Sequence, residues 1–98
     1  MRGPKRKPMH PGAVLRVDVL PALRMTQAEF ARRIGMSRLT VCELLLEKRG
    51  LSPEIANRIG RLDTAPESWL RMQEALDLWK VNQHPEKLAE IRPIKAAA

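Results

Sequence analysis

The chain has 98 residues and a mass of 11.1 kDa, which is enough for one domain with a single hydrophobic core. Hydrophobic residues make up 44% and charged residues 30%, a balance typical of a globular protein and not of a disordered one. No apolar run can span a bilayer and no signal-peptide core follows the basic start, so we expect a cytoplasmic protein without a membrane anchor. The single cysteine, Cys42, excludes an internal disulfide and a multi-cysteine zinc site.

The net charge of +7 is distributed unevenly along the chain. Residues 1–8 hold four basic residues and no acidic one, and residues 24–49 hold six basic and three acidic residues. Residues 50–91 hold five basic and seven acidic residues. A basic segment next to a mildly acidic one indicates a nucleic-acid-binding face beside a face that contacts protein, although a charge that only keeps the chain in solution fits equally well.

Helix signals begin after a flexible basic arm, which we place at residues 1–9. Residues 11–23 carry apolar side chains on one helical stripe, with His10 as a candidate N-cap and Pro11 in the first turn. Pro21 is expected to close or kink this helix, because it has no backbone N–H to donate.

Two short helices follow, and each starts at a capping residue. Thr26 and Glu29 fit a capping box, and Gly35 fits the left-handed residue that ends a helix. Ser37 is the N-cap of the second helix, which we expect to end near residues 48–50.

Two more helices are expected in the second half of the chain. Residues 52–54 (Ser-Pro-Glu) form a strong helix start, and a second capping box, Thr64 with Glu67, opens the longest helix at about 66–82. A further turn or two is expected at 84–91. No stretch alternates with a period of two, so the sequence predicts an all-α fold with five helices and no strand.

Residues 27–46 fit a helix-turn-helix. Ala31 is small where the two helices would approach most closely, Gly35 suits the turn, and Val41 and Leu44 would pack against the first helix. Polar side chains remain at the exposed start of the second helix, which in such motifs lies in the DNA major groove. A helical hairpin that only packs needs neither this spacing nor those polar residues, so the motif favours DNA binding.

Several segments carry a resemblance to a known family. The motif resembles the lambda-repressor-like, Xre-type helix-turn-helix domains in T-Q-A-E-F-A (26–31) and G-M-S-R-L-T-V (35–41). The wider chain resembles one branch, the HigA-type antitoxins (virulence-associated protein I among them), in H-P-G-A-V-L (10–15), L-L-L-E-K-R-G-L-S-P-E-I-A-N-R-I (44–59) and P-E-S-W-L-R-M-Q-E-A-L-D-L-W (66–79). Where the family often has a tyrosine before the aspartate of the last segment, this chain has Leu76 and lacks the phenol hydroxyl.

The resemblance implies a five-helix lambda-repressor-like domain at 10–82, with a dimerisation helix at about 66–82 and a short helical turn and tail at 83–98. It implies the antitoxin of a type II toxin–antitoxin system, which neutralises a RelE-like mRNA endonuclease toxin and represses its own operon as a dimer. The implied partners are that toxin, a second copy of the chain, and double-stranded DNA with an inverted-repeat operator.

The expected DNA contacts are Gln27, Ser37, Arg38, Leu39, Thr40, Glu43, Lys48 and Arg49. Gln27 lies at a helix N-terminus, which favours phosphate, and the equivalent glutamine of related domains clamps the DNA backbone. Arg38 can bond bidentately to guanine, with a solvated arginine as the alternative. Lys48 and Arg49 would meet the DNA backbone or compensate the helix dipole.

Alternatives stay open for the remaining contacts. Ser37 would act both as a cap and as a phosphate donor. Leu39 would touch a thymine methyl group or pack on the neighbouring loop. Glu43 would accept from cytosine N4 or pair with Arg38, and Thr40 would reach a base or phosphate or neither.

The expected homodimer contacts are Trp69, Met72, Leu76 and Trp79, which follow coiled-coil spacing along the last helix. The alternative is a core stripe that buries this helix on its own domain. Leu70, Leu78 and Val81 form a second apolar strip, and so small a chain has little core to cover both strips. One strip is therefore expected to be an interface, with tryptophan a favoured anchor.

The sequence gives no support for an enzyme. It has no arrangement of a nucleophile with a histidine and no glycine-rich phosphate loop, and no ligand set surrounds His10 or His84, so neither a cofactor nor a metal is expected. Two other functions remain open: a phage-type or metabolic helix-turn-helix repressor without a toxin, and a helical module that binds only protein.

Overall fold

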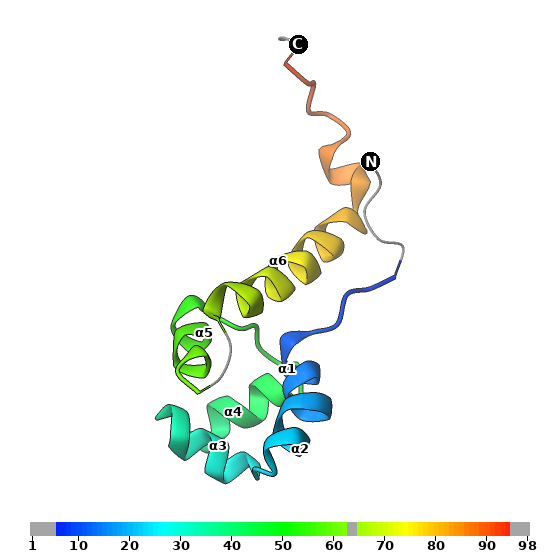
Figure 1. The fold of residues 1–98 in the computed structure, drawn as a ribbon. Coiled ribbons are helices and arrows are strands. Elements are labelled where there is room, and N and C mark those ends of the chain that lie inside the picture. Colours follow the sequence, from blue (N-terminus) through cyan, green and yellow to red (C-terminus); the bar gives the residue numbers. More distant parts are fainter. Residues whose placement is uncertain (1–5, 63–64, 95–98) are drawn as a thin grey trace.

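The computed structural model describes residues 6–62 and 65–94, which form helices and loops without a strand. The first helix is continuous and consists of α1 (Pro11–Val14), a π-helical turn (Leu15–Val19) and α2 (Leu20–Leu23). It is followed by α3 (Gln27–Ile34), α4 (Arg38–Leu45), α5 (Pro53–Gly60), α6 (Pro66–Asn82) and a 3-10 turn (Pro85–Leu88) (Figure 1). Counted in this way, the predicted all-α fold with five helices is confirmed.

Pro21 does not end the first helix. Because proline has no N–H, a regular helix would leave the carbonyl of Val17 without its usual partner. The chain instead widens into the π turn, in which the N–H of Leu20 donates to the carbonyl of Leu15. The helix then continues through α2 and ends at Arg24, which takes the left-handed conformation with φ of 55°.

Side-chain caps start the helices largely where the sequence predicts them. The hydroxyls of Thr26, Ser37 and Ser52 accept from the N–H groups of Glu29, Thr40 and Ile55 at 3.1, 3.1 and 3.2 Å. Nδ1 of His10 accepts from the N–H of Gly12 at 2.9 Å, which confirms His10 as the cap of α1. Thr64 lies outside the described residues, and the N-cap position of α6 is Ala65, which makes no side-chain bond.

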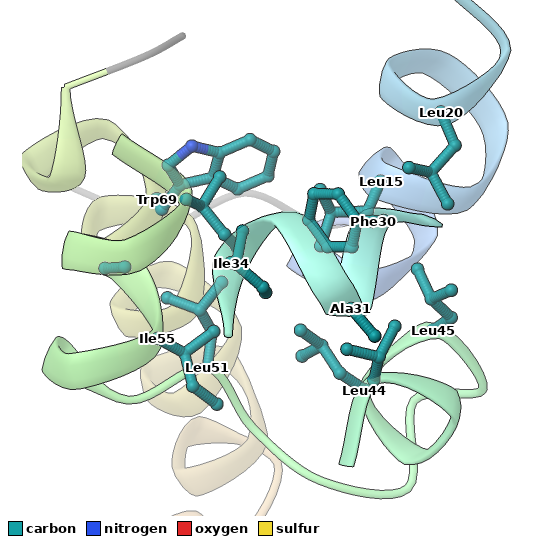
Figure 2. Packing of buried hydrophobic residues seen from close by; sticks show 13 residues of the cluster. Leu15, Leu20, Phe30, Ala31, Ile34, Leu44, Leu45, Leu51, Ile55 and Trp69 are labelled. Carbon is teal, nitrogen blue, oxygen red and sulfur yellow. The ribbon is translucent and has the colours of Figure 1, made fainter. Parts of the chain in front are cut away.

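The core surrounds α3, the first helix of the helix-turn-helix motif (Figure 2). Phe30, Ala31 and Ile34 face inward from α3, as the sequence predicts, and each is at most 5% exposed. The surrounding elements contribute Leu15 and Leu20 from the first helix, Leu44 and Leu45 from α4, Ile55 from α5 and Trp69 from α6. The motif is therefore part of the domain core and not a hairpin attached to its surface.

Gly12 allows the first helix to lie directly on α4. A Cβ atom at this position would lie 1.8 Å from the carbonyl oxygen of Leu44, so a larger residue would push the two helices apart. The first helix thereby supports the C-terminal half of α4 from behind.

α6 packs on the domain from Trp69 to Leu76, and its C-terminal end projects beyond the domain (Figure 1). Trp69 is 2% exposed and Leu76 is 0% exposed within the single chain. Between them Gln73 is buried, accepts from the N–H of Leu51 at 2.8 Å and donates to Asp77 at 2.8 Å. This stripe is therefore the face by which α6 packs on its own domain.

The predicted dimer seam requires a correction at these two residues. Trp69 and Leu76 have no surface left to offer a second copy, because the core of their own chain covers them. Met72 is half-buried against the same core. Trp79 is half-buried as well, and the ammonium of Lys7 lies over its ring, 5.9 Å from the centroid. The basic arm thus runs back along α6 over residues 6–10 (Figure 1).

None of the helices in the described ranges combines the length and the apolar character that crossing a membrane requires.

Candidate nucleic-acid interface

The structure arranges residues 27–46 as two short helices joined by a tight turn. α3 ends at Gly35, whose φ of 71° is the left-handed conformation that the sequence predicts. The N–H groups of Gly35 and Met36 donate back to the carbonyls of Arg32 and Ala31, which closes the helix end. Two residues later Ser37 caps α4, so α4 starts immediately after the turn.

The start of α4 presents a mixed polar and apolar surface to solvent. Arg38 is exposed, and Leu39 is 68% exposed, so Leu39 does not pack on the neighbouring loop. Ser37 donates its hydroxyl to Oγ1 of Thr40 at 2.8 Å while accepting the N–H of the same residue. The helix start thus offers a guanidinium, a branched alkyl group and a hydroxyl, which can contact guanine, a thymine methyl and phosphate.

Glu43 pairs with Arg49 and not with Arg38. Nε of Arg49 lies 3.5 Å from Oε1 of Glu43, and both side chains are more than one third exposed. Such an exposed pair is worth little in free energy, so either partner remains available to DNA.

The basic residues after α4 lie outside the helix. α4 ends at Leu45, and Glu47 takes the left-handed conformation with φ of 64°. The N–H of Lys48 then donates to the carbonyl of Glu43 at 2.8 Å, so Lys48 and Arg49 follow the helix end in an exposed loop. Gln27 is exposed at the N-terminus of α3, as a phosphate contact requires.

Two arginines outside the motif bond to the C-terminal ends of its helices, and the sequence reading missed both. Arg58 of α5 donates to the carbonyls of Ile34 and Gly35 at the end of α3. Arg16 of the first helix donates to the carbonyl of Leu45 at the end of α4, and its Nη2 lies 3.4 Å from Glu47. Their partners are 23 to 31 residues away in sequence, so no local pattern predicts these bonds.

An open cavity of about 360 Å³ lies between the loop after α4 and α6. Its lining includes His10, Gln73, Asp77 and Lys80. Burial lowers the pKa of His10 below its ordinary value of 6.5. Lys80 and Lys7 also lower it, while Glu47 and a hydrogen bond with the backbone of Arg49 act in the opposite direction. The described ranges hold no group of three His, Cys, Asp or Glu side chains that could bind a metal.

Known proteins are similar to this chain over most of their length. The chain matches no protein-family profile. It is 32% identical to the antitoxin HigA-1 of Vibrio cholerae over 96% of this chain and 90% of that protein. It is also 32% identical to the HTH-type transcriptional regulator YbaQ of Escherichia coli, over 100% of this chain and 88% of that protein.

A solved structure is similar in both fold and sequence. Antitoxin GraA in complex with its operator superposes with a TM-score of 0.84 at 33% sequence identity, over 99% of this chain and 98% of that chain. The likeness therefore includes α6 as well as the helix-turn-helix.

Proposed function

The chain belongs to the family of HigA-type antitoxins, and from this premise we propose that it binds its own operator as a homodimer and neutralises a RelE-like mRNA endonuclease toxin. Its relatives are antitoxins and transcriptional regulators, which are not enzymes. The observation that carries the DNA-binding part is the exposed start of α4 on a helix-turn-helix, in a fold that a relative presents to operator DNA.

The proposed DNA contacts fall into two groups. Arg38 and Leu39 read base edges from the start of α4, with Thr40 and Glu43 beside them. The phosphate contacts, which set the position of the helix in the groove, are Gln27, Ser37, Lys48 and Arg49. The exposure of Gln27, Arg38 and Leu39 supports their availability to DNA.

The proposed dimer uses the exposed face of α6. Leu78 and Val81 are 57% and 55% exposed, and with Leu70 they line an open groove of about 430 Å³, whose lining also includes Gln73, Glu74 and Asp77. A single recognition helix reads only a few base pairs, so two copies related by a two-fold axis are needed for a specific operator. The operator is then an inverted repeat with half-sites roughly 34–36 Å apart.

The proposed toxin partner rests on family membership, and a co-expression experiment tests it. We expect the gene next to this chain's coding region to encode a small protein that stops growth alone, and that copurifies with this chain and is harmless beside it. The double variant Gln27→Ala, Arg38→Ala should still neutralise it, because DNA and toxin are proposed to use different surfaces.

Two outcomes would change the proposal. Growth arrest that persists with the unmodified chain would favour the repressor without a toxin. Loss of neutralisation in the folded double variant would mean that toxin and DNA share one surface.

A further inference from the structure

Arg58 connects α5 to the turn of the helix-turn-helix motif. Its Nη1 donates to the carbonyl oxygens of Ile34 at 2.9 Å and Gly35 at 3.1 Å. Its Nε and Nη2 both donate to Oε2 of Glu54, one turn earlier in α5, at 3.2 and 3.0 Å. Because the guanidinium is planar and rigid, the carboxylate on one side fixes the direction of the donor on the other side.

The two carbonyls are those that the end of α3 leaves without a helical partner. The last carbonyls of a helix have no N–H ahead of them, and they carry the negative end of the helix dipole. A cation that donates hydrogen bonds both pairs with these carbonyls and compensates the negative end of the dipole. Gly35 is matched to this contact, because a Cβ there would lie 3.0 Å from Nη1 of Arg58 and would need the left-handed φ of 71°.

The turn that Arg58 contacts also fixes where α4 begins. Only Met36 and Ser37 separate Gly35 from Arg38, so a displacement of the Gly35 carbonyl is transmitted to the side chains that are proposed to read bases. The hydrogen bonds of the Arg58 side chain go to these two carbonyls and to Glu54, all within the protein.

We propose that Arg58 is a positioning residue for sequence-specific DNA recognition, which sets the start of α4 through the turn without touching DNA itself. This inference rests on the proposed operator binding. Glu54 orients the guanidinium. Glu54 and Arg58 together therefore hold the turn that sets the position of the start of α4.

The test compares variants of the full chain on two DNA duplexes. One duplex is the DNA directly upstream of the chain's own coding region, and the other is a scrambled duplex of equal length. The variants are Arg58→Gln and Arg58→Lys, with Arg61→Gln as a matched control that removes a charge from the exposed end of the same helix. Affinity is measured over a series of salt concentrations, and circular dichroism gives the folded fraction.

Arg58→Gln should weaken binding to the upstream DNA about tenfold, the effect expected when hydrogen bonds to a charged group are lost. Binding to the scrambled duplex should change by less than about twofold, and the slope of log affinity against log salt should be unchanged, because no phosphate contact is lost. Arg61→Gln should leave the ratio of the two affinities unchanged.

Two results would overturn the inference. Equal weakening on both duplexes with a slope reduced by about one would mean that Arg58 binds phosphate directly. Unchanged upstream affinity in a folded variant would leave Arg58 a purely structural contact. If Arg58→Gln does not fold, Arg58→Lys is the deciding variant, because lysine keeps the charge and lacks the planar guanidinium. A smaller loss of discrimination between the two duplexes, at an unchanged salt slope, supports the inference. Full discrimination by Arg58→Lys overturns it.

The same experiment distinguishes a failure of operator recognition from a failure of the role proposed for Arg58. An unmodified chain that binds both duplexes equally would remove operator recognition, and this inference with it. Unaffected discrimination in the Arg58 variants would remove only the role of Arg58.

Discussion

Arg38 and Gln27 occupy equivalent exposed positions at the starts of α4 and α3, yet we expect them to contribute differently to binding. Arg38→Ala should cost about 1–3 kcal/mol at one base pair and relax the preference there, because a bidentate arginine distinguishes guanine from other bases. Gln27→Ala should weaken binding to all sequences alike, since phosphates carry no sequence information. Affinities for a panel of single-base-pair changes in the upstream DNA measure this, and an exchange of the two patterns would show the roles to be reversed.

His10 should make the stability of the domain depend on pH. Burial lowers its folded-state pKa below 6.5, and Nδ1 must be unprotonated to accept the N–H of Gly12. At a pH between the two pKa values, His10 is protonated in the unfolded chain and neutral in the folded chain. The contribution of neutral His10 to the free energy of unfolding is therefore complete above about pH 6.5, and it is lost as the pH falls through the folded-state pKa.

The variant His10→Asn isolates this effect, because asparagine is a good N-cap that does not titrate. We expect the unmodified chain to lose more stability than His10→Asn between about pH 7.5 and 5.5, as measured by urea unfolding at each pH. Parallel losses in the two proteins would assign the pH dependence to other groups.

At the scale of single elements, helix starts could be predicted because they depend on neighbouring residues. Thr26, Ser37 and Ser52 each cap the helix that follows within three residues, and Gly35 ends α3 in the left-handed conformation. The end of α4 could not be predicted in this way, because the left-handed residue there is Glu47 and not a glycine.

The sequence does not show which surface covers the apolar stripe of a helix. The spacing of Trp69 and Leu76 establishes a buried face on α6, but the same spacing fits a second copy of the chain and the chain's own core. The structure resolves this, because Trp69 packs in the same core as Leu51 and Ile59, and Leu76 is 0% exposed within the single chain.

Leu76→Glu should therefore unfold the domain instead of separating a dimer. The side chain is 0% exposed, and a carboxylate in its place would be buried without a partner. We expect a loss of about 4 kcal/mol or more, which is a large part of the 5–15 kcal/mol that typically stabilises a domain. Circular dichroism at increasing temperature measures it, and a folded variant of unchanged stability would contradict the core assignment.

At the scale of the whole molecule, the contacts that orient α4 join segments far apart in sequence. Gly12 lies against Leu44, and the side chains of Arg16 and Arg58 bond to carbonyls of α4 and α3. Periodicity and capping describe one helix at a time, so they predict the motif and its exposed residues but not the supports that fix its direction.

We expect the exposed face of α6 to form the homodimer interface. Leu78→Glu should leave the chain folded, because this side chain is 57% exposed, while weakening the dimer by placing two like charges near a shared axis. Sedimentation of the folded variant measures the dimer. A dimer of unchanged affinity would place the interface on another surface.

Recognition of a specific operator by the start of α4 can be tested with a single affinity ratio. The unmodified chain is titrated, at about 150 mM salt, with its own upstream DNA and with a scrambled duplex of the same length. We expect the upstream DNA to bind at least about 10³-fold more tightly, as it does for specific regulators. Equal affinity for the two duplexes, or no binding to either, would contradict it.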